Sequence, residues 1–158
     1  FENLLVTKLY IPSLTINHVT RPRLFQLLDE GLRWASGRIS LDEGDNDPVR
    51  FLSYLVAAIR TVKPEVGDLS SMHFPSGDSY EGVLVPLVNE LAHVLEPFML
   101  VLDDYHTIHA RPIHDALAFL IVNLPPNVHI FMATRARLPR PCLLPAWGTG
   151  WRGYVWLA

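Results

Sequence analysis

The chain has 158 residues, of which 49% are hydrophobic and 18% are charged, and its formal net charge is -3. These values are typical of a soluble globular protein, and the small negative charge offers no basic face for direct binding of nucleic acid. One cysteine, Cys142, excludes an internal disulfide, and no apolar stretch approaches the roughly 20 residues of a membrane span. We therefore expect a cytoplasmic protein that binds neither nucleic acid nor membrane.

The sequence predicts one domain followed by a tail of different character. We expect the domain over residues 1–138 and the tail over residues 139–158, where tryptophan, glycine and proline become abundant. The tail shows no regular pattern, which favours translation out of an ancestral reading frame over a native hairpin. The chain also begins at Phe1 without a leader, and we interpret it as a fragment of a longer reading frame.

Apolar spacing and breaker residues predict alternating helices and strands after an extended arm over residues 3–20. The predicted helices are 22–31, 48–62, 83–95 and 113–123, and the predicted strands are 37–41, 98–102 and 128–134. A surface loop is expected over residues 65–81. Strands that alternate with helices indicate an α/β fold, with a small parallel sheet covered by helices.

Two aspartates follow the most apolar of these strands. The run 98–102 is continuously hydrophobic, as in a strand that is buried on both faces, and it ends in Asp103 and Asp104. This is the Walker B pattern, in which the first carboxylate holds hydrated Mg²⁺ and the second orients water. The alternative is that the two aspartates only cap the following turn.

The strand 128–134 ends in a similar way, because Thr134 is followed by Arg135. An arginine at the end of a neighbouring parallel strand can face the phosphates of a nucleotide. The alternative is an ordinary surface arginine.

Five stretches in chain order carry a more specific signal. They are 6–12, 19–24, 39–52, 100–106 and 133–135. Together they resemble the nucleotide-binding domain of MalT-like regulators of the LuxR type, ATP-dependent transcription factors of the STAND class of signalling NTPases. The resemblance covers about residues 4 to 138. It implies that Asp103 is the Walker B carboxylate and Mg²⁺ ligand, that Asp104 is its neighbour, that Arg135 is a sensor arginine and that Arg21 lies near the adenine.

One part of the family pattern is missing. Between the helix 22–31 and the strand 37–41 the family has a strand, a glycine-rich loop ending in Gly-Lys-Thr, and a helix, a unit of about 25 to 30 residues. Only residues 33–38 stand there. The nearest imitation, from Gly31 to Ile39, has five residues between its glycines, Arg38 in place of lysine, and isoleucine in place of the hydroxyl residue. We therefore expect neither ATP nor Mg²⁺ as a cofactor of this chain, and no ATP hydrolysis.

The resemblance also implies where the missing strand belongs. The sheet order would run from strand 37–41 through 98–102 to 128–134, with the missing strand beside the last of these. Strand 128–134 would then be an open edge, a template for pairing with another chain. We expect self-association through this edge; the alternatives are that residues 154–157 or the arm around Leu5 cover it.

The sequence leaves two other functions open. The first is a reduced protein-interaction module without catalysis. The second is a metal-dependent hydrolase that uses Asp103, Asp104 and His106, with His109 and His114 close by in the sequence.

Overall fold

The computed structural model describes residues 4–10, 34–67, 80–134 and 154–157. The predicted helix 22–31, the middle of the predicted loop, and the residues Arg21 and Arg135 lie outside these ranges. In chain order the described elements, with η for a 3-10 helix, are η1 (Val6–Leu9), β1 (Ala35–Ser40), η2 (Glu43–Asn46), α2 (Pro48–Val62), α3 (Glu81–Ala92), β2 (Phe98–Asp103), η3 (Tyr105–Thr107), α4 (Arg111–Asn123), β3 (Val128–Thr134) and β4 (Tyr154–Leu157).

The strands form a single parallel sheet in the order β1-β2-β3-β4. Ile39 of β1 stands beside Leu102 of β2, which stands beside Met132 of β3. These three side chains are almost completely buried. The α/β fold class, the three predicted strands and their order are therefore confirmed.

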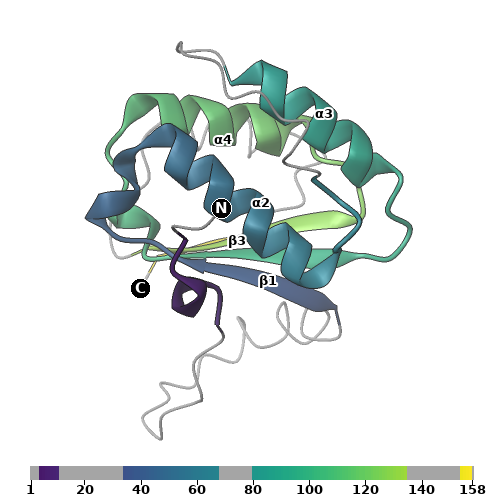
Figure 1. Cartoon of the computed structure of the whole chain (residues 1–158), viewed down its shortest axis with the longest axis horizontal. Coiled ribbons are helices and arrows are strands. Elements are labelled where there is room, and N and C mark those ends of the chain that lie inside the picture. The colour runs from purple at the N-terminus through teal and green to yellow at the C-terminus, as the bar shows by residue number, and fades with distance from the viewer. Residues whose placement is uncertain (1–3, 11–33, 68–79, 135–153, 158) are drawn as a thin grey trace, which may run out of the picture.

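Helices α2, α3 and α4 lie together on one face of the sheet (Figure 1). The core lies between this helical layer and the strands, because alternate strand residues such as Phe98, Leu100 and Leu102 are buried against it. Helix α2 packs especially closely. A Cβ atom on Gly37 of β1 would lie 2.3 Å from the carbonyl oxygen of Ala58 in α2, so only glycine fits this position.

The sequence determines the ends of α2 through capping and proline. The Asp47 side chain accepts a hydrogen bond of 2.7 Å from the backbone N–H of Arg50, and Pro48 occupies the first turn, where its missing N–H costs nothing. The helix ends at Val62, two residues before Pro64. Along α2 the apolar residues recur on one face, and that face is buried.

Two predictions about the ends of the chain are wrong. The arm contains the turn η1 instead of being extended throughout. The tail, for which no regular element was predicted, contains β4, which pairs in parallel with Phe131–Thr134 of β3. The expected open edge on β3 is therefore covered over these residues by residues 154–157, one of the two alternatives to self-association. Whether residues 139–158 form a separate unit stays a prediction.

In the part of the chain that the structure describes, no helix is both long enough and apolar enough to cross a lipid bilayer.

Candidate functional site

The candidate site is the edge of the sheet where the parallel strands end. Because β1, β2 and β3 run in the same direction, Ser40, Asp103 and Thr134 reach the same edge. In open parallel sheets this carboxyl edge is where ligands bind. The loops that follow β1 and β2, residues 41–47 and 104–110, line it.

Arg38 of β1 forms an ion pair with Asp103 of β2. One guanidinium nitrogen, Nη2, donates a short hydrogen bond to Oδ2 of Asp103. The two residues share a face of the sheet because the alternating positions, Gly37 and Leu102, point to the helices. The side chains of Arg38 and Asp103 are only 18% and 28% exposed, so water screens this pair less than a surface pair.

The backbone turns sharply directly after Asp103. Asp104 has φ 54° and ψ 33°, a left-handed conformation that aspartate tolerates better than most residues. Its N–H donates to Oδ1 of Asp103 at 3.0 Å, and its carbonyl accepts from the N–H and the hydroxyl of Thr107. The Asp103 carboxylate thus has a partner on each oxygen, Arg38 on one and a backbone N–H on the other.

The acidic turn after β1 has a structural role. The Asp42 side chain accepts from the N–H of Gly44 at 2.8 Å. Asp42 and Asp45 also form a capping box, in which each side chain accepts from the backbone N–H of the other residue. Asn46 joins this turn to the loop after β2, since its side chain donates to the carbonyl of Thr107 and accepts from the N–H groups of His109 and Ala110. The turn therefore holds two strand-end loops together.

Lys8 of η1 is bound between two carboxylates of this turn. Its Nζ lies 2.6 Å from Oδ2 of Asp45, which is completely buried, and 2.8 Å from Oδ2 of Asp42. Burial lowers the pKa of Lys8, but the hydrogen bonds and charges of Asp42 and Asp45 outweigh it, so the pKa is raised overall. The hydrogen bond from Lys8 in turn lowers the pKa of Asp42. Arg50 lies 3.3 Å from the other Asp45 oxygen.

The arm is also bound to α2 through Tyr54. The N–H of Leu5 donates to the Tyr54 hydroxyl at 2.9 Å, and the ammonium of Lys8 lies 5.1 Å from the centre of its ring. This is within the distance of a cation–π interaction. Lys8 and Leu5 together attach the arm to the domain beside the candidate site.

The histidines proposed as metal ligands do not form a ligand cluster. Nδ1 of His114 is 2.8 Å from the hydroxyl of buried Tyr105, and burial lowers the pKa of His114. His106 Nδ1 lies 3.8 Å from a carboxylate oxygen of Asp104, beyond hydrogen-bond distance. Among the described residues, no group of three or more histidine, cysteine, aspartate or glutamate side chains is arranged to hold a metal ion.

The surroundings of Asp103 do not suit the Mg²⁺ that the Walker B pattern implies. Mg²⁺ is bound by oxygen ligands, several of them water, around one or two carboxylates. At Asp103 the position of a bound cation is taken by the Arg38 guanidinium, and the second oxygen accepts from Asp104. Arg38 therefore serves as the counter-ion of Asp103, and this counter-ion comes from the chain itself.

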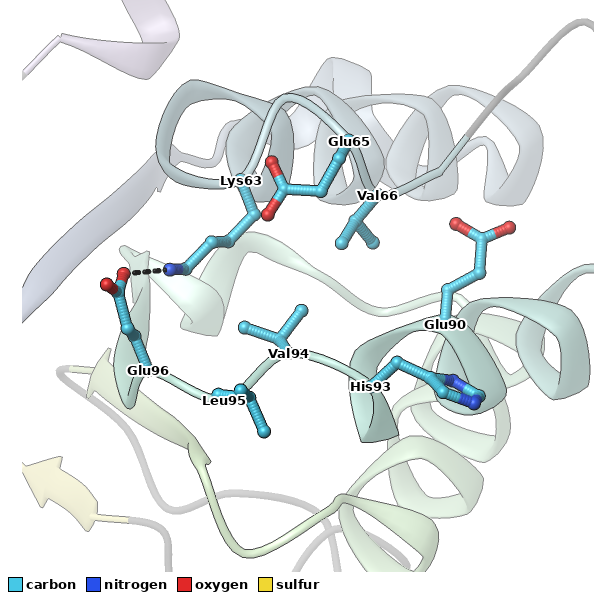
Figure 2. Close-up of a pocket in the computed structure, with 8 residues that line it drawn as sticks. All are labelled: Lys63, Glu65, Val66, Glu90, His93, Val94, Leu95 and Glu96. Atoms are coloured by element: carbon cyan, nitrogen blue, oxygen red, sulfur yellow. Dashed lines mark hydrogen bonds and ion pairs between the residues drawn. The ribbon is translucent and has the colours of Figure 1, made fainter.

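A pocket of 580 Å³ lies elsewhere, between the ends of α2 and α3. Figure 2 shows Lys63 and Glu96 facing one another across one end of it, with Glu90 at the other. Lys63 Nζ is 2.7 Å from Glu96, and Glu90 accepts from the N–H of Gly67, so these polar groups join the helix ends. The residues at the start of β2 are close by, so this pocket is at the amino edge of the sheet, away from Asp103.

The structure places Asp103 at the end of β2 and Asp104 directly after it, and it shows contacts of Arg38, Lys8 and Asn46 at the same edge. Arg38 was recognised in the sequence only as a failed phosphate-loop lysine. Lys8 and Asn46 belong to stretches that carry the family resemblance. The resemblance was the only indication in the sequence that these two residues lie at the site.

The sheet is small and parallel, its described helices lie on one face, and two aspartates stand at the end of its second strand. These features define the class of the protein: an α/β protein with a partial P-loop-like fold. The chain is 36% identical over 118 residues to the HTH-type transcriptional regulator MalT of Serratia proteamaculans, covering 68% of this chain and 13% of that protein. It is 36% identical over 110 residues to MalT of Klebsiella pneumoniae, covering 65% and 12%. This chain is therefore homologous to MalT-type regulators, and the resemblance is confirmed.

A third relative, MalT of Vibrio cholerae, is 28% identical over 162 residues, covering 84% of this chain and 18% of that protein. Since 84% of 158 residues is about 133, about 30 of the 162 aligned positions have no residue in this chain. The chain spans less than a fifth of the length of these relatives. No protein-family model matches it.

Proposed function

We propose that this chain is a reduced nucleotide-binding domain of a MalT-like regulator that neither binds ATP usefully nor hydrolyses it. In this proposal it derives from the STAND NTPase domain of the LuxR-type regulators, is cytoplasmic, and keeps Asp103, Asp104 and Arg135 as vestiges of the site.

The observation that carries the proposal is the position of β4. The resemblance implies that the strand leading into the phosphate loop would lie beside β3. In this chain that position is taken by Tyr154–Leu157, which pairs in parallel with Phe131–Thr134. A strand of the phosphate-binding unit cannot pair with the same edge at the same time, so β4 and a phosphate loop exclude one another.

Two further observations support it. The Vibrio alignment leaves about 30 positions without a residue of this chain, and a strand, glycine-rich loop and helix need about 25 to 30. The candidate site also offers an anion little attraction, because the described cation nearest to Asp103, Arg38, is already paired. Without a nest of N–H groups and the lysine, the carboxylates at this edge repel a triphosphate.

Isothermal titration of the chain with ATP and MgCl₂ tests the proposal. We expect a dissociation constant weaker than about 1 mM, equivalent to less than about 4 kcal/mol of binding free energy. The matched control is Asp103→Asn, which removes the Walker B carboxylate. Micromolar binding would overturn the proposal, and its loss in Asp103→Asn would show that the nucleotide site lies at this edge.

A further inference from the structure

The carboxylate that the resemblance assigns to Mg²⁺ has a guanidinium against it. Arg38 reaches Asp103 from the neighbouring strand, although the two are 65 positions apart in the sequence. Ser40, and not Arg38, stands directly beside Asp103 in the register, so the long arginine side chain extends along the strand toward the carboxyl edge. The contact thus depends on the parallel pairing of β1 with β2.

The environment makes this pair more than a surface contact. Both side chains are mostly buried, and the backbone N–H of Asp104 binds the second carboxylate oxygen at 3.0 Å. Hydrogen bonds between charged groups are about twice as strong as neutral ones. A divalent cation at Asp103 would have to displace the guanidinium or remain beside it. At about 4 Å, two like unit charges repel by several kcal/mol at the effective dielectric constant of a protein surface.

We infer that Arg38 is the permanent counter-ion of Asp103 and closes this carboxylate to Mg²⁺, independently of the missing phosphate loop. That Mg²⁺ is the cation concerned rests on the proposed function. The closure of Asp103 to a cation does not, because it depends only on the side chains of Arg38 and Asp103. Arg38 is then a positioning and specificity residue of the site, and it determines which cation the Walker B carboxylate accepts.

The test uses the full chain without nucleotide, and Mn²⁺ as the probe. Binding of Mn²⁺ is followed by loss of the electron paramagnetic resonance signal of the free ion, for wild type, Arg38→Lys and Arg38→Gln. We expect no binding that depends on Asp103 in wild type or in Arg38→Lys, which keeps the positive charge. Arg38→Gln should bind Mn²⁺ at least about tenfold more tightly than wild type, and adding Asp103→Asn should remove the gain.

Thermal unfolding provides a second measurement, in which each variant is compared with itself in MgCl₂ and in NaCl. MgCl₂ should raise the Tm of Arg38→Gln more than NaCl of equal ionic strength does, and should leave wild type at the NaCl value. If Arg38→Gln is unfolded in NaCl, MgCl₂ should restore its folded circular dichroism spectrum.

Three results would overturn the inference: Mn²⁺ binding by wild type that Asp103→Asn removes, a folded Arg38→Gln that binds no better than wild type, or an unfolded Arg38→Gln that Mg²⁺ does not restore. None of the three results changes the outcome expected for the ATP titration of the wild-type chain. Failure of the closure is therefore distinguishable from failure of the proposed function.

Discussion

Lys8 and Asp45 form a buried ion pair of 2.6 Å that joins the amino-terminal arm to the turn after β1. Lys8 is 8% exposed and Asp45 is 0% exposed, so water reaches Asp45 poorly if Lys8 is removed. An unpaired charge in such a position is costly, whereas the intact pair itself contributes little net stability.

Lys8→Met should therefore lower the free energy of unfolding by about 3 kcal/mol, since Asp45 would keep only Arg50 as a cationic partner. The control is Asp42→Asn, which keeps a side-chain oxygen for capping and removes a charge that is 60% exposed. It should cost less than about 1 kcal/mol. Urea unfolding monitored by circular dichroism gives both values, and equal costs would contradict the buried role of Asp45.

Gly37→Ala should destabilise the chain, because the new methyl group would meet the backbone carbonyl of Ala58 at 2.3 Å. Forcing β1 and α2 apart should cost about 1 to 3 kcal/mol. Gly82→Ala in α3 is the matched control, since nothing lies within 4 Å of its Cβ position. That substitution should stabilise the helix by up to about 1 kcal/mol. The two alanines should thus shift Tm in opposite directions, and a shift of Tm in the same direction would count against the packing of α2 on β1.

His114 should make the stability fall in mild acid. Burial lowers the pKa of His114 in the folded chain and outweighs the nearby charge of Asp115, which raises it, while His109 adds a smaller lowering. Below a pH of about 6.5 the unfolded chain therefore binds a proton that the folded chain does not yet bind, and the free energy of unfolding decreases. His114→Gln should show a smaller loss than wild type between pH 7.5 and 5.5 in urea titrations. Exposed His93→Gln should lose as much as wild type; identical pH dependence in all three would refute the assignment to His114.

Removal of residues 140–158 should expose the edge of β3 that β4 now covers. Unpaired N–H and C=O groups along Phe131–Thr134 would offer a template for a second molecule. We expect the shortened chain to associate in a concentration-dependent way, and the full chain to associate less. Light scattering at about 100 μM compares the two, and slow amide exchange over residues 131–134 in the full chain alone would agree with the pairing. A monomeric shortened chain with unchanged Tm would contradict it.

Local signals in the sequence were sufficient for most of the fold. Phe98–Leu102 is a short and continuously apolar run, which a buried parallel strand requires, and Asp47-Pro48 with Lys63-Pro64 marks both ends of α2. The turn η1 was missed because a single turn is too short to show a period. The strand β4 was missed because its four residues show no alternation and directly follow Gly153.

The contacts of the candidate site were beyond local reasoning. The Asp103-Asp104 pair was found because both residues follow one strand directly. Arg38 meets Asp103 across 65 positions and Lys8 meets Asp45 across 37, so each contact depends on the strand register or on the path of the arm. Spacing along the chain carries no information about such pairs, whereas the resemblance pointed to the segments that contain them.

The one-sided arrangement of the helices follows from handedness. Connections between parallel strands almost always turn to the right, so the face on which a connecting helix lands depends only on the direction in which the next strand is added. From β1 to β2 to β3 the chain always steps the same way, and α2, α3 and α4 accordingly share one face (Figure 1). A helix reaches the opposite face when the chain steps backward, and the resemblance implies one such step, from the missing strand beside β3 across to β1. Loss of the phosphate loop would therefore remove a ligand site and also a crossover of opposite direction. A sheet with helices on both faces would become one whose described helices α2, α3 and α4 cover a single face.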